Sequence, residues 1–297
     1  MTPKISILLP TRGRPDKAAD LFKSIEDCSE NLDRMEIILR LDDDDAPSHA
    51  LEPSISHKKI IGPRTSMGAL NTECFEQSDG DIIILLNDDM AVRTEQWDKI
   101  IRETHESFED GIYLAYANDM IAGELLCHIP ILSRKTCEIL ERPFPSEYQG
   151  GFIDYHLFDI FKRLLHQGKN RVRYLNIVEI EHMHFRVGKS SYDETYSARG
   201  QMDVGDEAFT GLRKYRQAAC ERLLAGIGGN PLPILPEPRR FDCPPRGAVH
   251  AFLRYAGIFL LDAGLPLKWR ANLFRLFNER YLRNRFGWYP PVPNETS

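Results

Sequence analysis

Runs of consecutive apolar residues alternate with stretches of helical periodicity along the first third of the chain. The runs have the length of strands, and between the first two of them Ala18, Leu21, Phe22 and Ile25 repeat at the spacing of one helix face. We predict strands at Ile5 to Leu9, Glu36 to Leu41, Lys58 to Ile61 and Ile82 to Leu86, with helices from about Asp16 and from Ser66 to Gln77. This β-α-β-α-β order predicts an α/β fold with a largely parallel sheet covered by helices.

The rest of the chain divides into two parts by its pattern. We predict helices at Thr94 to Phe108 and Phe152 to Gln167, and extended segments at Tyr113 to Ala117, Leu125 to Leu132 and Val172 to Ile180. After about Gly211 a charged helix leads into a Gly- and Pro-rich linker, and the remainder is helical in pattern and rich in aromatic residues and arginines. We therefore expect a first domain over 1–210 and a helical C-terminal extension over 211–297.

Composition narrows the class of protein. A chain of 297 residues with 42% hydrophobic content can bury a substantial core. The net charge of -6 argues against a broad nucleic-acid surface, so no nucleic-acid partner is expected. Six scattered cysteines without a CxxC pair indicate reduced thiols. The apolar segment that ends at Pro10 is too short for a signal peptide, and no run reaches the length of a membrane span. These features favour a cytoplasmic protein.

Acidic residues follow two of the predicted strands. The run from Ile82 to Leu86 shows no alternation, which is typical of a strand buried on both faces, and Asn87-Asp88-Asp89 follows it. Asp42 to Asp45 follow the strand that ends at Leu41 in the same way. Open parallel sheets bind their ligands at the carboxyl ends of strands. Two neighbouring strand ends that carry acids therefore predict a site for a divalent cation and a phosphate-bearing ligand.

Each acidic segment also has a structural interpretation. Asn87-Asp88-Asp89 could form a solvated turn, or Asp88 or Asp89 could cap a following helix. Four consecutive acids repel one another and most often form a solvated loop, so only one or two of Asp42 to Asp45 are expected to face a site.

The order and spacing of four segments resemble the nucleotide-binding half of GT-A glycosyltransferases, specifically the inverting family 2. These segments are Ile5 to Pro15, the Asp42-Asp43 loop, Gly68-Ala69-Leu70-Asn71 and Asn87-Asp88-Asp89. The resemblance covers roughly residues 4 to 200. It implies a Rossmann-like sheet flanked by helices, with a nucleotide-sugar half over 1–118 and an acceptor and metal half over 119–210. It further implies that the nucleotide sugar is bound by Pro10, Thr11, Arg12, Asp42, Asp43, Arg64, Asn71, Asn87 and Asp88.

The same resemblance implies a metal site. The DxD motif of the family corresponds to Asn87-Asp88-Asp89, with Asn in place of the first acid, which leaves Asp89 as the direct ligand of Mn²⁺ or Mg²⁺. A histidine completes the metal shell in many relatives. In an extended segment His182 and His184 point to one face, and the resemblance favours His184 over His182. Ordinary surface or core histidines are the alternative interpretation.

A catalytic base is implied by the segment from Gln149 to Tyr155. It resembles the Glu-Asp motif of the family, with Ile153 at the position of the first acid and Asp154 at that of the catalytic base. A carboxylate near a helix N-terminus is favoured in its ionised form, which a base requires. The alternative is an acid that merely complements the helix dipole. Residues 186–196 could form a lid over the diphosphate.

We therefore interpret the chain as a metal-dependent inverting glycosyltransferase. It would move a sugar from a nucleotide-sugar donor, with a UDP-sugar favoured, to a hydroxyl of a saccharide or lipid-linked acceptor in surface glycan biosynthesis. A sugar nucleotidyltransferase is disfavoured because the turn after the first strand has only one Gly, and a glycoside hydrolase would not need a nucleotide pocket. A non-catalytic nucleotide- or glycan-binding protein stays open, because Asn87 and Ile153 replace acids. The C-terminal helices could pack on the catalytic domain, contact anionic lipid or form a homo-oligomer.

Overall fold

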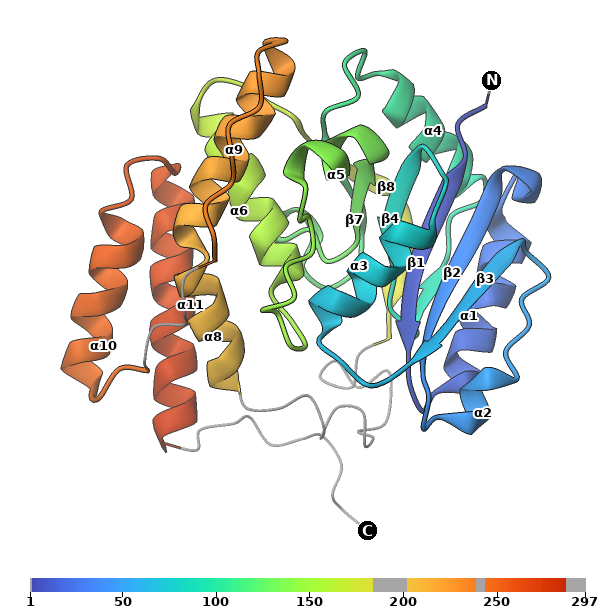
Figure 1. Ribbon diagram of the computed structural model, residues 1–297, viewed down its shortest axis with the longest axis horizontal. Helices are drawn as coiled ribbons and strands as arrows, with labels where there is room; N and C mark the ends of the chain where they lie inside the picture. Colours follow the sequence, from blue (N-terminus) through green and yellow to red (C-terminus); the bar gives the residue numbers. More distant parts are fainter. Residues whose placement is uncertain (1, 184–201, 239–243, 287–297) are drawn as a thin grey trace.

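The computed structural model describes residues 2–183, 202–238 and 244–286, and it shows an α/β protein. One mixed sheet of eight strands runs in the order β3-β2-β1-β4-β7-β6-β8-β5. Helices cover both faces of this sheet, and the C-terminal helices form a further layer beside α6 (Figure 1). The predicted α/β class with a helical C-terminal extension is confirmed.

The strands are β1 (Ile5–Thr11), β2 (Met35–Asp42), β3 (His57–Gly62), β4 (Ile82–Leu85), β5 (Met90–Val92), β6 (Leu114–Asn118), β7 (Pro130–Ser133) and β8 (Val172–His182). The α-helices are α1 (Pro15–Cys28), α2 (Ala46–His49), α3 (Met67–Gln77), α4 (Trp97–Glu106), α5 (Arg134–Leu140), α6 (Ile153–His166), α8 (Met202–Gly211), α9 (Arg213–Ile227), α10 (Ala248–Tyr255) and α11 (Leu267–Phe286). Short helical turns are η1 (Leu32–Arg34), η2 (Gly123–Leu125) and η4 (Ala256–Leu260), of which η4 is a π-helix.

The strand order corrects one expectation. We expected the strands that end in Asp42 and in Asn87 to be neighbours, but β1 lies between them and pairs in parallel with both β2 and β4. The chain runs outward from β1 to β2 and β3, and α3 then returns it to β4 on the other side of β1. This reversal is a topological switch point, and open α/β sheets bind their ligands beyond the carboxyl ends of the strands at such a point.

Side chains of β1 alternate between two hydrophobic cores. Ile5, Ile7 and Leu9 join a core with α1 and α4, whereas Leu8 joins a core with α3, α5 and α6. The second core continues without a break into α8, α9, α10 and α11. Both faces of the central strands are therefore buried, as their unbroken apolar runs predict.

The region between β6 and α6 differs from the expected pattern. Instead of an extended segment over 125–132, the structure has the turn η2 followed by the shorter strand β7. The turn forms because one oxygen of Asp119 accepts the backbone N–H groups of Ile121, Ala122 and Gly123. The short helix α5 was not predicted, although Ser133 caps it by accepting from the Thr136 N–H. The helix expected from Thr94 begins only at Trp97.

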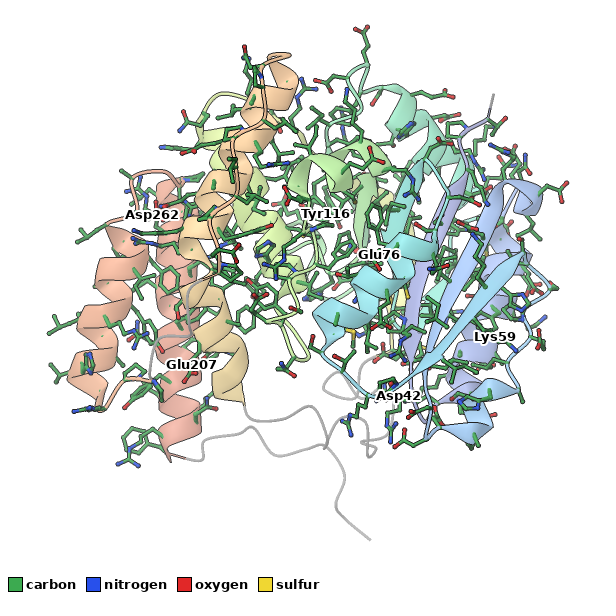
Figure 2. The ribbon with its side chains drawn as sticks, in the orientation of Figure 1. Asp42, Lys59, Glu76, Tyr116, Glu207 and Asp262 are labelled. Carbon is green, nitrogen blue, oxygen red and sulfur yellow. The ribbon has the colours of Figure 1, made fainter. Side chains whose placement is uncertain are left out.

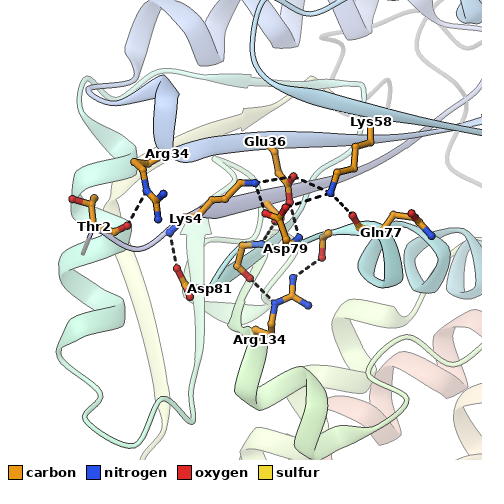
Figure 3. A network of polar contacts seen from close by, with 12 residues as sticks. Thr2, Lys4, Arg34, Glu36, Lys58, Gln77, Asp79, Asp81 and Arg134 are labelled. Atoms are coloured by element: carbon orange, nitrogen blue, oxygen red, sulfur yellow. Dashed lines mark hydrogen bonds and ion pairs between the residues drawn. The ribbon is translucent and has the colours of Figure 1, made fainter.

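The amino ends of the central strands are tied together by polar contacts. Glu36 accepts from the Lys4 ammonium at 3.0 Å, the Ser6 hydroxyl at 2.6 Å and the Asp79 backbone N–H at 2.8 Å. Arg134 donates to the Gly80 carbonyl at 2.7 Å from the other side of the same network (Figure 3). These groups satisfy one another, which indicates a structural role for this network.

The C-terminal helices are joined to α6 around one buried carboxylate. Asp159 of α6 accepts from Arg163, from Arg216 of α9 and from Trp269 of α11. The division into 1–210 and 211–297 stays a prediction. Among the described helices, none is both long and apolar enough to cross a bilayer. All five cysteines in the described part of the chain are free thiols.

Candidate active site

Asp88 and Asp89 are buried at the carboxyl end of β4. Asp88 is 5% exposed and Asp89 is 0% exposed, so they do not form a solvated turn. Strand β5 begins at the next residue, and the N-cap of α4 is Gln96, so neither acid caps a helix. Both structural interpretations of this segment are wrong. Two buried acids side by side need partners that offset the cost of burying charge.

Asp88 finds its partners in the turn after β1. It accepts a hydrogen bond from the Thr11 hydroxyl at 2.8 Å and one from the Arg14 guanidinium at 3.1 Å. Burial raises the pKa of Asp88, and the charge of Arg14 only partly offsets this effect. Arg14 also lies 3.8 Å from Asp89. Arg14, which the sequence pattern did not single out, fixes the β1 turn against both acids.

The turn after β1 is also joined to the acidic loop after β2. Arg12 donates to Asp42 at 2.9 Å and, with its other terminal nitrogen, to Asp44 at 2.9 Å. Asp45 accepts the Gly13 backbone N–H at 2.7 Å. Figure 2 shows Asp42 at the end of β2, on the edge of the sheet opposite the Glu36 network.

Two of the four consecutive acids are buried, in line with the expectation that repulsion between them would let only one or two face a site. Asp42 is 4% exposed and Asp45 is 7% exposed, whereas Asp43 and Asp44 are exposed. The structure therefore places the predicted Asp43 side chain toward solvent. Asp45, which was not singled out, is the acid that binds the backbone of the turn after β1, at the Gly13 N–H.

The remaining residues expected to bind the nucleotide lie in or after β1, β3 and β4 and in α3, in different environments. Pro10 is buried within β1, and Asn87 is half-buried after β4. Asn71 is buried, and its side-chain amide donates to the Met67 carbonyl within α3 at 2.9 Å. Arg64 is exposed in the loop after β3. The pKa of Asp44 is lowered chiefly by its hydrogen bond with Arg12 and also by the charge of Arg64.

His182 lies beside Asp89 because of strand pairing. Strand β8 runs antiparallel to β5, with His182 opposite Met90, and the Met183 N–H donates to the Asp89 carbonyl at 2.8 Å. The His182 Nε2 atom is 3.4 Å from Asp89 Oδ1. His184, the histidine that the resemblance favours, lies outside the described residues, and so does the expected lid at 186–196.

A second acid and histidine complete this cluster. Asp119 follows β6 and is 2% exposed, and its second oxygen is hydrogen-bonded to His128 Nδ1. Although burial raises the pKa of Asp119, the His128 hydrogen bond and the backbone donors outweigh burial and lower the pKa to about 2. Neither residue was predicted. Asp119 could have been found from the sequence, because it follows a predicted strand, as Asp42 and Asp89 do.

Asp154 lies in the first turn of α6, facing this cluster. Its side chain is 22% exposed, and its Oδ2 atom is 3.7 Å from His128 Nε2. Burial raises the pKa of Asp154, although the charge of His128 opposes the rise. A carboxylate with a raised pKa is a stronger proton acceptor once it is ionised.

The turn that leads into α6 is strained and held by aromatic contacts. Phe152 has φ 73°, in the left-handed region that bulky residues rarely adopt. Its ring packs 5.5 Å from that of Phe209 and 5.6 Å from that of Phe277, between centroids. Packing from α8 and α11 therefore fixes the position of Asp154, two residues further along the chain.

The side chains of the cluster fit a divalent cation. Two adjacent ligands of an octahedral Mg²⁺ or Mn²⁺ lie about 3 Å apart, since each bond is about 2.1 Å long. Asp89 Oδ1 and His182 Nε2 are 3.4 Å apart, close to that separation. Carboxylate oxygens suit Mg²⁺ and Mn²⁺, and imidazole nitrogens suit transition metals, so this mixed set is compatible with Mn²⁺.

Comparison with known proteins gave structural matches only. No family model matches the chain, and no curated sequence does. The mannosyltransferase PcManGT from Pyrobaculum calidifontis, solved with GDP-Man and Mn²⁺, has a TM-score of 0.54 and 10% identity, over 97% of this chain and 89% of its own. TarS 1–349 from S. aureus, solved with UDP-GlcNAc, has a TM-score of 0.55 and 11% identity, over 96% of this chain and 93% of its own. At these identities the likeness shows a shared fold, and the predicted GT-A type of α/β fold is confirmed.

Proposed function

We propose that this chain is a metal-dependent inverting glycosyltransferase that uses a nucleotide-sugar donor. The main observation in support of the proposal is that three features lie close together at one edge of the sheet. A basic turn lies next to buried acids, acid and histidine side chains suit a cation, and a partly exposed carboxylate faces them. Two proteins of the same fold were solved with GDP-Man and with UDP-GlcNAc, which supports a nucleotide-sugar donor. A UDP-sugar is our first choice.

The residues that follow β1, β2 and β4 have proposed roles in donor binding. Asp42, held by Arg12, would bind the ribose or base, and Thr11 and Arg14 would hold Asp88 beside the diphosphate. Asp89 and His182 would ligate Mn²⁺ or Mg²⁺, with His184 as the ligand that the family resemblance favours. A bound cation neutralises the charge that develops on the departing nucleoside diphosphate.

Asp154 would act as the catalytic base in a single displacement. Its carboxylate takes the proton of the acceptor hydroxyl while the hydroxyl oxygen bonds to the anomeric carbon. The bond from that carbon to the diphosphate oxygen breaks in the same step, with inversion of configuration. The raised pKa of Asp154 supports this role, because a more basic carboxylate takes the proton more readily.

A donor screen tests the proposed function. We expect UDP-sugars to raise the melting temperature in the presence of Mn²⁺, because a ligand bound only by the folded state stabilises it by about 2.7 kcal/mol at one hundred times its Kd. GDP- and dTDP-sugars belong in the same screen, each with Mn²⁺ and with EDTA. A melting temperature that no nucleotide or nucleotide sugar changes would contradict the proposal.

We propose a saccharide or lipid-linked acceptor, in the biosynthesis of a surface glycan, bound on the side of the C-terminal helices. A pocket of about 290 Å³ there is lined by polar and aromatic residues, among them Asp206, Arg254 and Tyr281. Asp206 accepts from Arg280 at 2.6 Å, and the Arg280 guanidinium lies 4.8 Å from the centre of the Phe152 ring. The pocket is thus joined to the turn that positions Asp154. Figure 2 shows Glu207, another lining residue, on α8.

The C-terminal helices would also contact a membrane surface peripherally. Residues 244–286 carry eight basic and two acidic side chains, a net charge of +6, whereas the whole chain carries -6. On this basic segment Val249, Leu253 and Leu261 are 75%, 63% and 79% exposed. Exposed apolar side chains among basic residues suit a surface of anionic lipid.

We expect the protein to sediment with vesicles that contain anionic lipid and not with neutral ones. The double variant Leu253→Asp with Leu261→Asp should weaken this binding at least tenfold, since burying each leucine contributes about 1.5–3 kcal/mol. Ile234→Asp is the control, because Ile234 is 93% exposed but lies outside the basic segment. A dimer that the double variant dissociates, without vesicle binding in the native protein, would support homo-oligomerisation instead.

A further inference from the structure

We infer that Asp119, His128 and His182 form a three-ligand site for a divalent transition-metal cation. One ligand atom from each of these residues lies within 4.8 Å of the others. In an octahedral shell with bonds of about 2.1 Å, ligand atoms are about 3 to 4.2 Å apart, so small side-chain movements close this group around one cation. The inference deepens the proposed function, on which the catalytic meaning of the site rests.

Long-range pairing brings the three residues together. Asp119 follows β6, His128 precedes β7 and His182 ends β8, and the His182 N–H donates to the Asp119 carbonyl at 3.2 Å. Three backbone N–H groups hold one Asp119 oxygen, so the direction of the carboxylate is fixed. Preorganised ligands of this kind lose little freedom when a cation binds.

The hydrogen bond between Asp119 and His128 marks the position of the cation. The second oxygen of Asp119 shares a proton with His128 Nδ1. A divalent cation replaces such a proton, since metal ligation requires the neutral imidazole and the ionised carboxylate. The side chain of Asp119 is 2% exposed, that of His182 13% and that of His128 26%, so the group is buried on one side and open on the other.

The ligand set predicts which cation binds. Two imidazole nitrogens and one carboxylate oxygen favour Mn²⁺, Co²⁺ or Zn²⁺ over Mg²⁺ and Ca²⁺, which prefer oxygen ligands. His182 also borders Asp89, and His128 borders Asp154. The site thus extends the metal centre from the end of β4 toward the proposed base, using two residues that no DxD-type motif includes.

Titration with Mn²⁺ alone tests the site without any nucleotide. We expect Asp119→Asn and His128→Gln each to weaken Mn²⁺ binding at least tenfold, since loss of a residue that only orients a metal ligand already costs about 10–100-fold. Calorimetry or the electron paramagnetic resonance of free Mn²⁺ measures the affinity. His57→Gln is the matched control, because His57 also pairs with a carboxylate, Glu52 at 2.9 Å, on β3 far along the sheet. That variant should bind Mn²⁺ like the native protein.

A spectroscopic measurement complements the affinities. Pulsed electron paramagnetic resonance of bound Mn²⁺ should show nitrogen couplings in the native protein that are reduced in His128→Gln. Mn²⁺ affinities of Asp119→Asn and His128→Gln within twofold of the native value, or bound Mn²⁺ without nitrogen coupling, would overturn the inference. Circular dichroism of each variant establishes that it is folded. If His128→Gln is not folded, the Mn²⁺ affinity of Asp119→Asn alone tests the site.

The outcomes separate this site from the proposed function. If nucleotide sugars stabilise the protein but Asp119→Asn and His128→Gln leave Mn²⁺ binding unchanged, the three-ligand site is wrong and the transferase proposal stands. If both variants weaken Mn²⁺ binding and His128→Gln reduces the nitrogen coupling, but no nucleotide sugar binds, the site is right and the transferase proposal is wrong.

Discussion

Asp154→Asn is expected to lower sugar transfer about 100- to 10,000-fold while donor binding stays intact. The amide keeps the shape of the carboxylate but cannot accept the acceptor proton, and removal of a general base typically has an effect of that size. The donor contacts proposed for Arg12, Asp42 and Asp89 do not involve this side chain. Turnover is measured as release of the nucleoside diphosphate with acceptor present, and donor binding as the shift in melting temperature.

A second first-turn acid provides the control for this variant. Asp16 lies in the first turn of α1, as Asp154 lies in that of α6. If Asp154 only complemented the helix dipole, Asp154→Asn and Asp16→Asn would both cost about 0.3–1 kcal/mol of stability and neither would change turnover. Turnover of Asp154→Asn within tenfold of native would therefore contradict the role of base.

The same assay tests the non-catalytic alternative. A protein that has lost turnover would bind the donor and release no nucleoside diphosphate, even without a substitution. Ile153, which by the proposed resemblance stands at the position of an acid, is buried in the hydrophobic core. The native protein, assayed with donor and Mn²⁺, therefore decides between transferase and binding protein.

Local sequence pattern predicts the strands of the first half of the sheet well, for a physical reason. Strands β1, β2 and β4 are buried on both faces, so each appears as an unbroken apolar run, and the polar residues that follow must lie at the sheet edge. Asp42, Asp88 and Asp89 are all buried there. Strand order is not a local property, and the placement of β1 between β2 and β4 was consequently missed.

The second half of the candidate site depends on contacts between distant segments. Antiparallel pairing of β5 with β8 places His182 beside Asp89, yet β5 has three residues and no distinct pattern. His128 lies in an irregular segment before β7, and its contacts with Asp119 and Asp154 distinguish it from a surface histidine. Arg14 belongs to a turn that would be solvated without Asp88. Partners of this kind become visible only in three dimensions.

Asp159→Ala is expected to lower the free energy of unfolding by about 3–5 kcal/mol, the usual cost of removing one partner from a buried ion pair. Asp159 is 0% exposed and accepts from Arg163 at 2.9 Å, from Arg216 at 2.8 Å and from Trp269 at 3.0 Å. The variant leaves the buried guanidinium of Arg216 without this carboxylate, whereas Arg163 keeps Asp262. Urea denaturation of native and variant protein measures the difference.

The pH dependence of this difference follows from the direction of the pKa shift. Although burial raises the pKa of Asp159, Arg163 and Arg216 outweigh burial and lower it. A carboxyl with a lowered pKa in the folded state stabilises the protein above its unfolded pKa of about 3.9, and this contribution is lost as the pH falls through the folded value. The difference in free energy of unfolding between native and Asp159→Ala protein should therefore be largest at neutral pH and decrease below about pH 4.

A partly exposed ion pair provides the matched control. Asp110 accepts two hydrogen bonds from Arg171, at 3.1 and 2.6 Å, but the two side chains are 27% and 22% exposed. Asp110→Ala should cost at most about 1 kcal/mol, because solvent screens the pair and replaces the lost contacts. If both variants lost the same stability, the contacts of Asp159 with α9 and α11 would contribute no more than a surface ion pair. A loss confined to Asp159→Ala would show that this carboxylate holds the C-terminal helices against α6, and with them the aromatic packing that positions Asp154.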